Sequence, residues 1–565
     1  MYILGLYGAI DWNPLTTEDG WIHDSGATLF YNGTHLCSIQ EERLSRIKRD
    51  GSFPLSSIDY VCEAANIEKS NIDKIFYAQP SCIRFIKSLE DGSFNSKLTN
   101  LFPNAQLHVL SHHLCHAASS VFTSNLNEGH FISIDGSGNP LPNQSYDQGL
   151  VLHESTITKE EATYGYFNKN KNIFQMHNFP VRTNRFGKFY RMNSHELYCE
   201  KTNTKWDDIL KQDADGLPGK IMGLSAYGQT EWKDEYKCYT RSLDYNYPIP
   251  FINFVSGIQG KTIEERSWIL QKNFELAIVD LLNDMYEEKY VGKNICLAGG
   301  TFLNVLGNSC IKNLNKFDHI HIPPFPSDTG MNLGAAMYGV WKSGYNVEMP
   351  HNIALLGKNY DITIDDLPDN YCITEFRNFE ALCKTVAQHL INGKIIGWFQ
   401  GRSENGPRAL GSRSILMHPG PKENKDIINE KIKHREYWRP FAGVILEDRL
   451  DEYFLESHET PYMLYSNTTK PCKLDKIAAI THEDHTCRIQ TVNNKLNRKM
   501  TMLLEQFEKV SGLPILLNTS FNDNGQPIVE TPKDAIDSFN KMNIDILVLG
   551  DFLLFKDEND VASGT

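Results

Sequence analysis

The stretch Phe131-Ile132-Ser133-Ile134-Asp135-Gly136-Ser137-Gly138 carries the prediction of the fold, because it joins a buried strand to an acidic, glycine-rich turn. We expect Gln148 to His153 to return as the next strand. A similar pattern occurs earlier in the chain. The strand Tyr2 to Leu6 leads to the turn His23-Asp24-Ser25-Gly26, and a second strand, Ala27 to Tyr31, follows it. The sequence therefore predicts the same strand-turn-strand unit twice.

A repeated unit of this kind is typical of a duplicated actin-like domain, in which two glycine turns face each other across a cleft that holds phosphates. Two unrelated hairpins are the alternative. A third glycine element, Ile295 to Thr301, follows another buried strand, and we expect a helix from Phe302. Glycine lets a nucleotide approach the backbone, and a helix N-terminus favours an anion. These elements predict an α/β domain that binds a nucleotide.

The chain of 565 residues is long enough for two to four domains. The segment from Ser343 to Asp361 is rich in Gly, Pro and Asn, so we place a domain boundary there, between residues 1–352 and 353–565. The second part mixes helices with short strands such as Ile395 to Phe399 and Ile546 to Leu549. We expect it to be a separate α/β or α+β domain.

Charge and composition exclude several classes of protein. The formal net charge of −14 argues against a general nucleic-acid or anionic-membrane surface, although it allows a local basic pocket. The chain has no apolar run of the roughly 18 residues that a membrane span needs. Met1 to Trp12 lacks a basic region and does not predict a signal peptide. The 12 cysteines are scattered without a CxxC pair, which favours reduced thiols in a cytoplasmic enzyme.

Two histidines in a predicted helix form a candidate metal site. His112 and His116 are four residues apart, so they share one helix face at a spacing that allows both imidazoles to bind one ion. Asp135 in the glycine turn and Asp328 in a later Ser-Asp-Thr-Gly turn could complete a set of two histidines and two carboxylates. Such a set suits iron, manganese or zinc acting as a Lewis acid. A purely structural histidine pair is the alternative.

A second candidate site lies in the arginine-rich segment Gly401 to Ser414, where three arginines alternate with glycines and Pro407 predicts the start of a helix. Between Gly401 and Arg439, nine basic residues stand against five acidic ones. A solvated charged face would explain this excess, but glycine-interleaved arginines favour binding of phosphate oxygens. Arg488 and the segment Asn518-Thr519-Ser520 offer further polar groups. No P-loop is present, so a Walker-type ATPase is excluded.

Taken together, the motifs resemble one family. The chain is similar to the ATP-dependent O-carbamoyltransferases of natural-product biosynthesis, which include the tobramycin, cephalosporin and nodulation-factor carbamoyltransferases. The resemblance runs over nearly the whole chain. It rests on these segments: His23 to Ala27, His112 to Ser120, Gly219 to Leu224, Ala298 to Asn304, Gly401 to Leu416, Lys433 to Phe441 and Leu517 to Asn522.

This resemblance implies two domains and two reactions. The first domain would be actin-like and similar to the metal-dependent subunit that completes threonylcarbamoyladenosine in tRNA. The second would resemble the YrdC-like enzyme that makes threonylcarbamoyl-adenylate. Carbamoyl phosphate and ATP, with Mg²⁺, would give carbamoyl-adenylate in the second domain. The first domain would then transfer the carbamoyl group to a hydroxyl of a small, sugar-containing acceptor; a homodimer stays open.

The resemblance also assigns roles to residues by position. The metal ligands would be His112, His116, Asp135 and Asp328, with iron favoured over manganese or zinc. Catalytic groups near the reacting centre would be His23, Asp24 and Lys48. The first domain would contact a nucleotide through Gly299, Gly300 and Asn304. Carbamoyl phosphate and ATP would be held in the second domain by Arg408, Arg413, Lys433, Arg439, Arg488, Asn518 and Ser520.

Three other functions compete with this interpretation. A tRNA-modifying threonylcarbamoyl enzyme shares both domain types, but it would need a broad basic surface, which the charge of −14 disfavours. A hydrogenase-maturation carbamoyltransferase would carry paired-cysteine zinc motifs, which this chain lacks. A non-catalytic actin-like ATP-binding protein would have no reason to keep the four metal ligands together with the arginine set.

Overall fold

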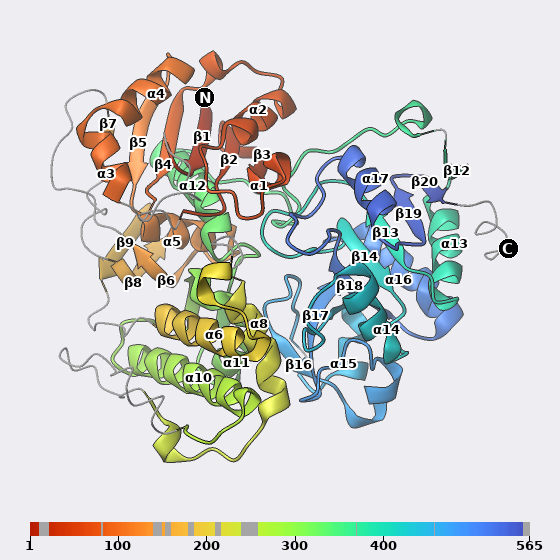
Figure 1. Ribbon diagram of the computed structural model, residues 1–565. Helices are drawn as coiled ribbons and strands as arrows, with labels where there is room; N and C mark the ends of the chain where they lie inside the picture. Colours follow the sequence, from red (N-terminus) through yellow and green to blue (C-terminus); the bar gives the residue numbers. More distant parts are fainter. Residues whose placement is uncertain are drawn as a thin grey trace. The chain divides into compact units, whose positions relative to one another are not determined.

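The structure is a computed structural model that describes residues 1–10, 22–80, 83–138, 150–152, 160–178, 186–209, 216–238, 258–368, 370–456 and 458–556. The chain divides into two compact units (Figure 1). The first unit contains Met1–Ser45 and Arg49–Met349, and the second contains Arg46–Lys48 and Pro350–Thr565. Among the helices described, none has the length and apolar character needed to cross a bilayer.

The first sheet of the first unit is built around the hairpin expected from the N-terminal sequence. Its strands are β1 (Tyr2–Tyr7), β2 (Gly26–Tyr31), β3 (Thr34–Gln40), β4 (Lys74–Ala78), β5 (Gln106–Leu110) and β7 (Leu150–Leu152), in the order β3-β2-β1-β4-β5-β7. β1 is antiparallel to β2 and parallel to β4. Asn32 and Gly33 connect β2 to β3 with φ angles of 48° and 94°, the left-handed backbone that an Asn-Gly hairpin turn requires.

The second sheet of this unit repeats the arrangement. Its strands are β6 (Glu128–Gly138), β8 (Glu160–Asn168), β9 (Ile173–Asn178), β10 (Asn294–Ala298) and β11 (His319–His321), in the order β11-β10-β6-β8-β9. Like β1, the strand β6 is antiparallel to the strand that follows it in the hairpin and parallel to the next strand of the sheet, here β10. The order β3-β2-β1-β4-β5 in the first sheet therefore matches β9-β8-β6-β10-β11 in the second.

The partner expected for the strand at Phe131 was wrong. Within the segment from Gln148 to His153, the described residues Leu150–Leu152 form β7, which pairs in parallel with β5 in the first sheet, and β6 instead pairs with β8. Along the β6–β8 ladder the pairing runs without a shift from Glu128 opposite Asn168 to Ile134 opposite Ala162. The residues between these strands, 139–149 and 153–159, lie outside the described residues. The expectation rested on the short distance along the chain between β6 and the segment at Gln148. The long run of paired residues between β6 and β8 is the stronger interaction.

Two helices lie between the sheets of the first unit and bring the candidate metal ligands together. α12 (Met331–Lys342) packs on β1 and β4, α5 (His112–Thr123) packs on β6 and β10, and the two helices pack on each other (Figure 1). Their contact is close, because a methyl group at Gly334 would lie 1.9 Å from the carbonyl oxygen of Cys115. α2 (Leu55–Ala64) packs against β2 and β3.

The remaining helices of the first unit include a group that packs together beside the second sheet. This group consists of α6 (Phe186–Thr202), α8 (Leu217–Leu224), α10 (Ile263–Glu287) and α11 (Val305–Asn313). α10 begins with a capping box, in which the side chains of Thr262 and Glu265 each accept a hydrogen bond from the other residue's backbone N–H. The other short helices are α1 (Glu42–Ser45), α3 (Ile83–Glu90) and α4 (Ser93–Leu101).

The second unit is a mixed sheet flanked by helices, which confirms the α/β class. Its strands are β12 (Cys372–Glu375), β13 (Ile396–Phe399), β14 (Arg413–Met417), β15 (Ala442–Leu446), β16 (Ser466–Thr468), β17 (Thr486–Val492), β18 (Ile515–Ser520), β19 (Ile546–Leu549) and β20 (Phe552–Phe555). Their order is β12-β20-β19-β13-β14-β18-β15-β17-β16. Its helices are α13 (Phe379–Ile391), α14 (Glu423–Ile427), α15 (Leu450–Tyr453), α16 (Arg498–Ser511) and α17 (Pro532–Lys541), and α13 packs on α16.

The helix expected at Pro407 does not form. The arginine-rich segment is instead a loop that leads directly into β14. The Oε1 atom of Glu404 accepts hydrogen bonds from the backbone N–H groups of Leu410 at 2.7 Å, Ser412 at 2.8 Å and Arg413 at 3.1 Å. A carboxylate that binds three N–H groups in this way competes with helical hydrogen bonding. Gly411 supports the same turn with a φ of 90°.

Candidate functional site

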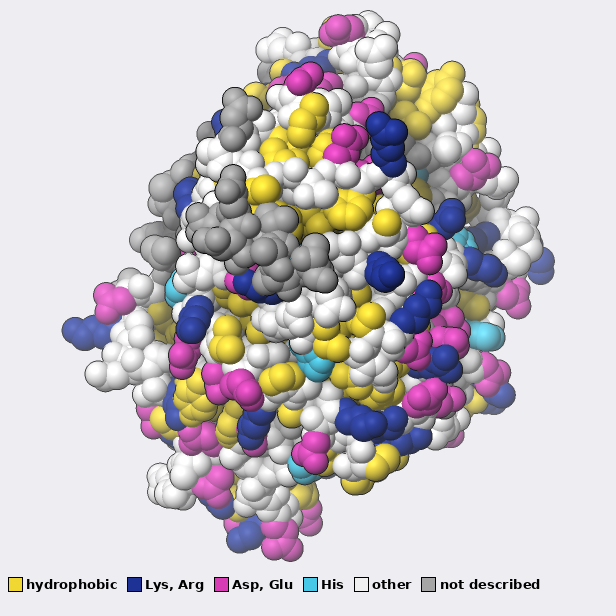
Figure 2. Space-filling view, turned by 90° about the vertical axis from the view of Figure 1, so that its right-hand side faces the viewer, with side chains coloured by type: hydrophobic (Ala, Val, Ile, Leu, Met, Phe, Trp, Pro, Cys, Tyr) yellow, Lys and Arg dark blue, Asp and Glu magenta, His cyan; other side chains and the backbone are white. Residues whose placement is uncertain are grey.

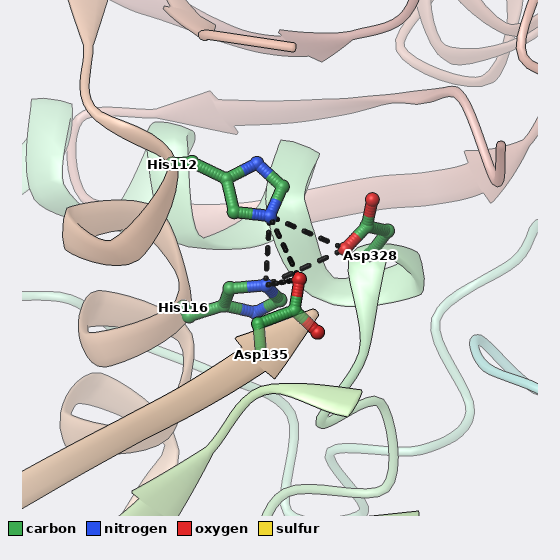
Figure 3. A group of neighbouring side chains, drawn as sticks. All are labelled: His112, His116, Asp135 and Asp328. Atoms are coloured by element: carbon green, nitrogen blue, oxygen red, sulfur yellow. Dashed lines mark hydrogen bonds and ion pairs between the residues drawn. The ribbon is translucent and has the colours of Figure 1, made fainter. Parts of the chain in front are cut away.

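Four side chains from three parts of the first unit converge on one point (Figure 3). His112 and His116 project from successive turns of α5, which begins at His112 because the side chain of Ser111 caps the backbone N–H of Leu114. Asp135 is carried by β6, and Asp328 lies in the turn that leads into α12. One donor atom from each of the four side chains lies within 4.8 Å of all the others.

The donor atoms of the four side chains lie close together. His112 Nε2 is 3.2 Å from His116 Nε2 and 3.3 Å from Asp135 Oδ2. Asp328 Oδ1 lies 3.4 Å from each of the two Nε2 atoms. His112 and His116 are fully buried, and Asp328 is nearly so. Two imidazole nitrogens and two carboxylates facing one another in a buried site form an arrangement that a divalent cation stabilises.

The tautomer of His112 fits metal binding. Its Nδ1 atom lies 3.2 Å from the backbone carbonyl oxygen of Gln79, a group that can only accept a hydrogen bond. In the neutral imidazole, Nδ1–H therefore donates to Gln79, and the lone pair is on Nε2, which faces the other three ligands. This is the outer hydrogen bond that commonly fixes a metal-binding histidine. The residues present thus fit a metal ion of the borderline class that binds imidazole together with carboxylate.

The electrostatics of the group also favour a bound cation. Burial alone lowers the pKa of His112, but the charges of Asp328 and Asp135 raise it well above its ordinary value. Burial alone raises the pKa of Asp328, but His112 and His23 hold it well below its usual range. Without a metal, the carboxylates therefore favour a proton on His112. A divalent ion can replace that proton.

His23 and Asp24 form a hydrogen-bonded pair in the same unit. His23 Nδ1 is 2.9 Å from Asp24 Oδ2, and Asp24 is buried with a φ of 61°, a backbone region that a non-glycine residue rarely adopts. Burial alone lowers the pKa of His23, but Asp328 and then Asp24 raise it overall. The pair therefore lies within electrostatic reach of a candidate metal ligand.

The glycine turn at Gly299 and Gly300 contacts the same group. Gly299 has a φ of 100°, and a methyl group there would lie 2.0 Å from the carbonyl oxygen of Ile134. The N–H of Gly300 donates to Asp135 Oδ1 at 2.9 Å. The helix expected from Phe302 begins later: a 3-10 turn covers Gly300–Leu303, and Asn304 caps α11 by accepting a hydrogen bond from Gly307 N. Asn304 also bonds with Gln271, so its amide is used within the fold.

Two residues of this site were missed by the sequence analysis. Tyr7 donates its hydroxyl hydrogen to Asp328 Oδ2 at 2.6 Å, and a tyrosine within an apolar strand gives no signal other than core packing. The second residue is Arg191, which lies four residues after Gly187 on one face of α6. Gly187 approaches the turn of Asp135, because a methyl group there would lie 3.8 Å from Asp135 O. Burial, followed by Arg49, lowers the pKa of Arg191 to about 10, against the opposing charges of Asp135 and Asp328.

The second unit contains a group of cations that we call the cationic cluster: Lys433, Arg435, Arg439, Arg488 and Lys48. Burial, followed by the charges of Arg435, Lys48 and Arg439, holds the pKa of Lys433 well below its ordinary value. Burial, followed by Arg439 and Arg488, does the same for the pKa of Arg435. Lys433 is only 3% exposed. Like charges that depress one another's pKa in a buried place are suited to an anionic ligand.

The sheet positions several expected ligand residues beside this cluster. Arg488 in β17 and Asn518 in β18 lie opposite the same residue of β15, Ala442, one on each side. The Nζ atom of Lys433 donates to the carbonyl oxygen and the side chain of Asn522, at 2.6 and 3.0 Å, and also to the carbonyl oxygen of Ser520. The structure therefore brings Lys433, Arg439, Arg488, Asn518 and Ser520 into one region of the second unit.

Two of the expected arginines have different surroundings. Arg413 is fully buried, and its Nη1 atom donates to the backbone carbonyls of Gln400 and Gly401, while its Nε atom donates to that of Glu530. Two of its three guanidinium nitrogens therefore hold the main chain. Arg408 lies in the loop that Glu404 ties together and is half-buried.

Lys48 lies in a short segment that is assigned to the second unit. The short segment Arg46–Lys48 belongs to the second unit, although the residues on either side of it belong to the first. Arg46 donates from Nη1 and Nη2 to the backbone carbonyls of Ile528 and Pro527, at 2.8 Å each, and Lys48 Nζ donates to that of Gln526 at 3.3 Å. Within the second unit, Lys48 therefore lies near Lys433, and its catalytic role stays a prediction.

Comparison with known proteins shows which family models and which relatives match this chain. Family models described as the carbamoyltransferase N-terminus and C-terminus match residues 17–87 with 97–337, and residues 387–556, respectively. Nodulation protein NolNO of Sinorhizobium fredii is 29% identical and aligns with 98% of this chain and 83% of its own length. Nodulation protein NolO of Bradyrhizobium diazoefficiens is 32% identical over 79% of each chain.

The similarity to solved structures is weak. A structure of HypF from T. kodakarensis has a TM-score of 0.36 and 14% identity, with 60% of this chain and 48% of that chain covered. A full-length HypF in the phosphate- and nucleotide-bound form has a TM-score of 0.32 and 13% identity, with 61% and 47% covered. This chain therefore spans about half the length of each of these two proteins.

Proposed function

Because this chain belongs to the carbamoyltransferase family, we propose that it is an ATP-dependent O-carbamoyltransferase acting on a small-molecule alcohol. The observation that carries the proposal is the division of chemistry between the two units. The first unit contains a buried group of four potential metal ligands, and the second contains the cationic cluster. Such a division is what a reaction in two steps, activation and then transfer, requires.

In the proposed first step the second unit activates the carbamoyl group. Carbamoyl phosphate loses its phosphate to water, and an oxygen of the resulting carbamate attacks the α-phosphorus of MgATP, which releases pyrophosphate and forms carbamoyl-adenylate. Both substrates are polyanions, so Lys433, Arg439, Arg488 and Lys48 would neutralise their phosphate charge. Asn518 and Ser520 would add neutral hydrogen bonds, and the Glu404-tied loop would present Arg408.

In the proposed second step the first unit moves the carbamoyl group to the acceptor hydroxyl and releases AMP. His112, His116, Asp135 and Asp328 would hold a divalent ion, with iron favoured over manganese or zinc. When bound, this ion supplies a Lewis acid for the oxyanion charge of acyl transfer. His23, oriented through Nδ1 by Asp24, would accept the hydroxyl proton at Nε2. The turn of Gly299 and Gly300 would lie against the nucleotide, and Arg191 would face its phosphate.

The finer fold assignment belongs to the same proposal. We assign the first unit to the actin-like class, supported by the repeated strand order of its two sheets. We assign the second unit to the YrdC-like class, with residues 1–352 and 353–565 as the two domains apart from Arg46–Lys48. We place the enzyme in the cytoplasm, where ATP is present and where the described cysteines would stay free thiols.

The proposed acceptor is a polar, sugar-containing natural product, by analogy with the alcohols on which the resembled enzymes act. A tRNA acceptor is the alternative. On the face drawn in Figure 2, Lys and Arg side chains are interspersed with Asp and Glu rather than gathered into one broad basic surface. Together with the net charge of −14, this supports a small acceptor over a polyanionic one.

The test is a reaction of the full-length protein with ¹³C-labelled carbamoyl phosphate, MgATP and a panel of sugar alcohols, aminoglycosides and tRNA. Mass spectrometry would detect the carbamoyl mass gain, and NMR would locate the label. A carbamate on oxygen together with AMP supports the proposal. A urea on nitrogen, activity only with tRNA, or no AMP from any mixture contradicts it.

A further inference from the structure

We propose that Tyr7 is a positioning residue of the metal centre, whose hydroxyl holds one oxygen of Asp328 so that the other oxygen faces His112 and His116. This inference rests on the metal centre of the proposed function. Tyr7 was not among the candidate residues, because nothing in its sequence context distinguishes it from a core aromatic.

The position of Tyr7 follows from the strand that carries it. β1 is flanked by β2 and β4, and Tyr7 is hydrogen-bonded into register with Gly26 on one side and Ala78 on the other. Side chains two residues apart point to the same face of a strand. Gly5 faces α12, because a methyl group there would lie 2.2 Å from Asn332 O. Tyr7 therefore points to the side of the sheet where α12 packs and where Asp328 precedes it.

The contact itself is short and shielded from water. Tyr7 is 1% exposed, and its O–H donates to Asp328 Oδ2 at 2.6 Å. Its ring also meets the ring of His112 edge-on, with centroids 6.1 Å apart. A carboxylate oxygen can only accept, so the tyrosine hydroxyl is the donor of this hydrogen bond.

The two oxygens of Asp328 consequently have different partners. Oδ2 is occupied by Tyr7, while Oδ1 lies 3.4 Å from both Nε2 atoms (Figure 3). A cation held by the four side chains would therefore meet a single oxygen of Asp328. Removing the hydroxyl would free Oδ2 and allow the carboxylate to rotate, which changes both the affinity for the ion and the number of oxygens that contact it.

A second contact from the same sheet acts in parallel. Gln79 directly follows β4, its N–H is held by Leu110 O at 2.9 Å, and its carbonyl oxygen faces His112 Nδ1. The first sheet thus fixes a carboxylate through Tyr7 and an imidazole through Gln79. Outer contacts of this kind typically change metal affinity by about 10–100-fold when they are removed.

The test compares Tyr7→Phe with a matched control, Tyr77→Phe, in the full-length protein. Tyr77 is also fully buried, lies in the neighbouring strand β4, and donates its hydroxyl to a backbone carbonyl, that of Gly8, at 2.8 Å. Both variants lose one buried hydroxyl, but only one of the two hydroxyls contacts a metal ligand. Co²⁺ is titrated into each metal-free protein, and its affinity and visible absorption spectrum are recorded along with thermal unfolding.

We expect Tyr7→Phe to bind Co²⁺ about 10–100-fold more weakly and with an altered spectrum, whereas Tyr77→Phe keeps the affinity and spectrum of the unaltered protein. Equal losses in both variants, or no loss in either, would overturn the inference. If the unaltered protein binds no Co²⁺, both this inference and the metal centre of the proposed function are wrong. Failure of carbamoyl transfer with normal Co²⁺ binding would instead count against the proposed function alone.

Discussion

At the level of single residues, the buried ammonium group of Lys433 leads to a prediction about pH. Burial and the neighbouring cations depress its pKa in the free protein, and a bound anion would raise it again. At a pH between the free and bound pKa values, anion binding must therefore take up a proton. Affinity for the anion should fall as the pH rises through the free pKa, because only the ammonium form attracts phosphate.

This linkage is measured by titrating pyrophosphate into the full-length protein calorimetrically in buffers of different ionisation enthalpy. The apparent binding heat should depend on the buffer in the pH range between the free and the bound pKa of Lys433. In Lys433→Met the affinity should drop and the buffer dependence should disappear. A buffer-independent heat with the unaltered protein across that range would show that Lys433 does not change its protonation on binding.

Metal content is a second prediction at this scale. Two imidazoles and two carboxylates form a borderline site, so the purified protein should hold about one first-row divalent ion per chain rather than magnesium. His116→Ala removes a fully buried candidate ligand from this group and should leave the protein nearly metal-free. Elemental analysis decides the question. Absence of metal together with full activity in strong chelator would contradict it.

At the level of elements, the turn between β10 and α11 should tolerate no side chain at Gly299. An alanine there would have an unfavourable φ, and its methyl group would lie 2.0 Å from Ile134 O. Ile134 directly precedes Asp135. Gly344, just after α12, provides the control, because its φ is 85° but a methyl group there would meet nothing within 4 Å.

We expect Gly344→Ala to cost about 1–2 kcal/mol of unfolding free energy from backbone strain alone. Gly299→Ala should cost clearly more and should also lower the metal content, since Gly300 N holds Asp135. Denaturant unfolding and elemental analysis measure the two effects. Equal destabilisation by both substitutions, with full metal content in each, would refute the close contact.

Local patterns predicted several elements, because their signals lie within a few neighbouring residues. The Asn32-Gly33 turn set the β2–β3 hairpin, and the four-residue spacing of His112 and His116 placed both on one face of α5. The partner of β6 was not predictable in this way, since β8 begins more than twenty residues after β6 ends and its pairing depends on the sheet as a whole. The loop at Pro407 was likewise missed, because Glu404 binds backbone N–H groups up to nine residues further along the chain, beyond the span of a helical turn.

Some residues of the candidate site could likewise be predicted from local sequence, and others could not. Residues with distinctive chemistry, such as the four candidate metal ligands, could be singled out from their type and spacing, and the structure brings them together. Tyr7 and Arg191 could not, because each reaches the site through a strand register or a close helix approach that no motif records. Lys48 could be recognised as part of a motif. Its place in the second unit could not be predicted, because it depends on contacts with residues far along the chain, such as Gln526.

At the scale of the whole molecule, each unit contains one cluster of titratable groups that the net charge of −14 does not reveal. The cluster of the first unit consists of two carboxylates and two imidazoles, and that of the second is the cationic cluster. The units are also not separable by one cut near residue 350. A fragment that begins at Pro350 would lack Arg46 and Lys48, so tests of either reaction require the full chain.

The measurement that tests the division of labour most directly compares His116→Ala and Arg439→Ala in the full-length protein. AMP formed from ATP in the presence of carbamoyl phosphate, and carbamate formed on the acceptor, are quantified in the same reactions. His116→Ala should abolish carbamate formation and retain AMP formation, whereas Arg439→Ala should lose both. If His116→Ala stops AMP formation as completely as Arg439→Ala does, activation and transfer are not divided between the two units.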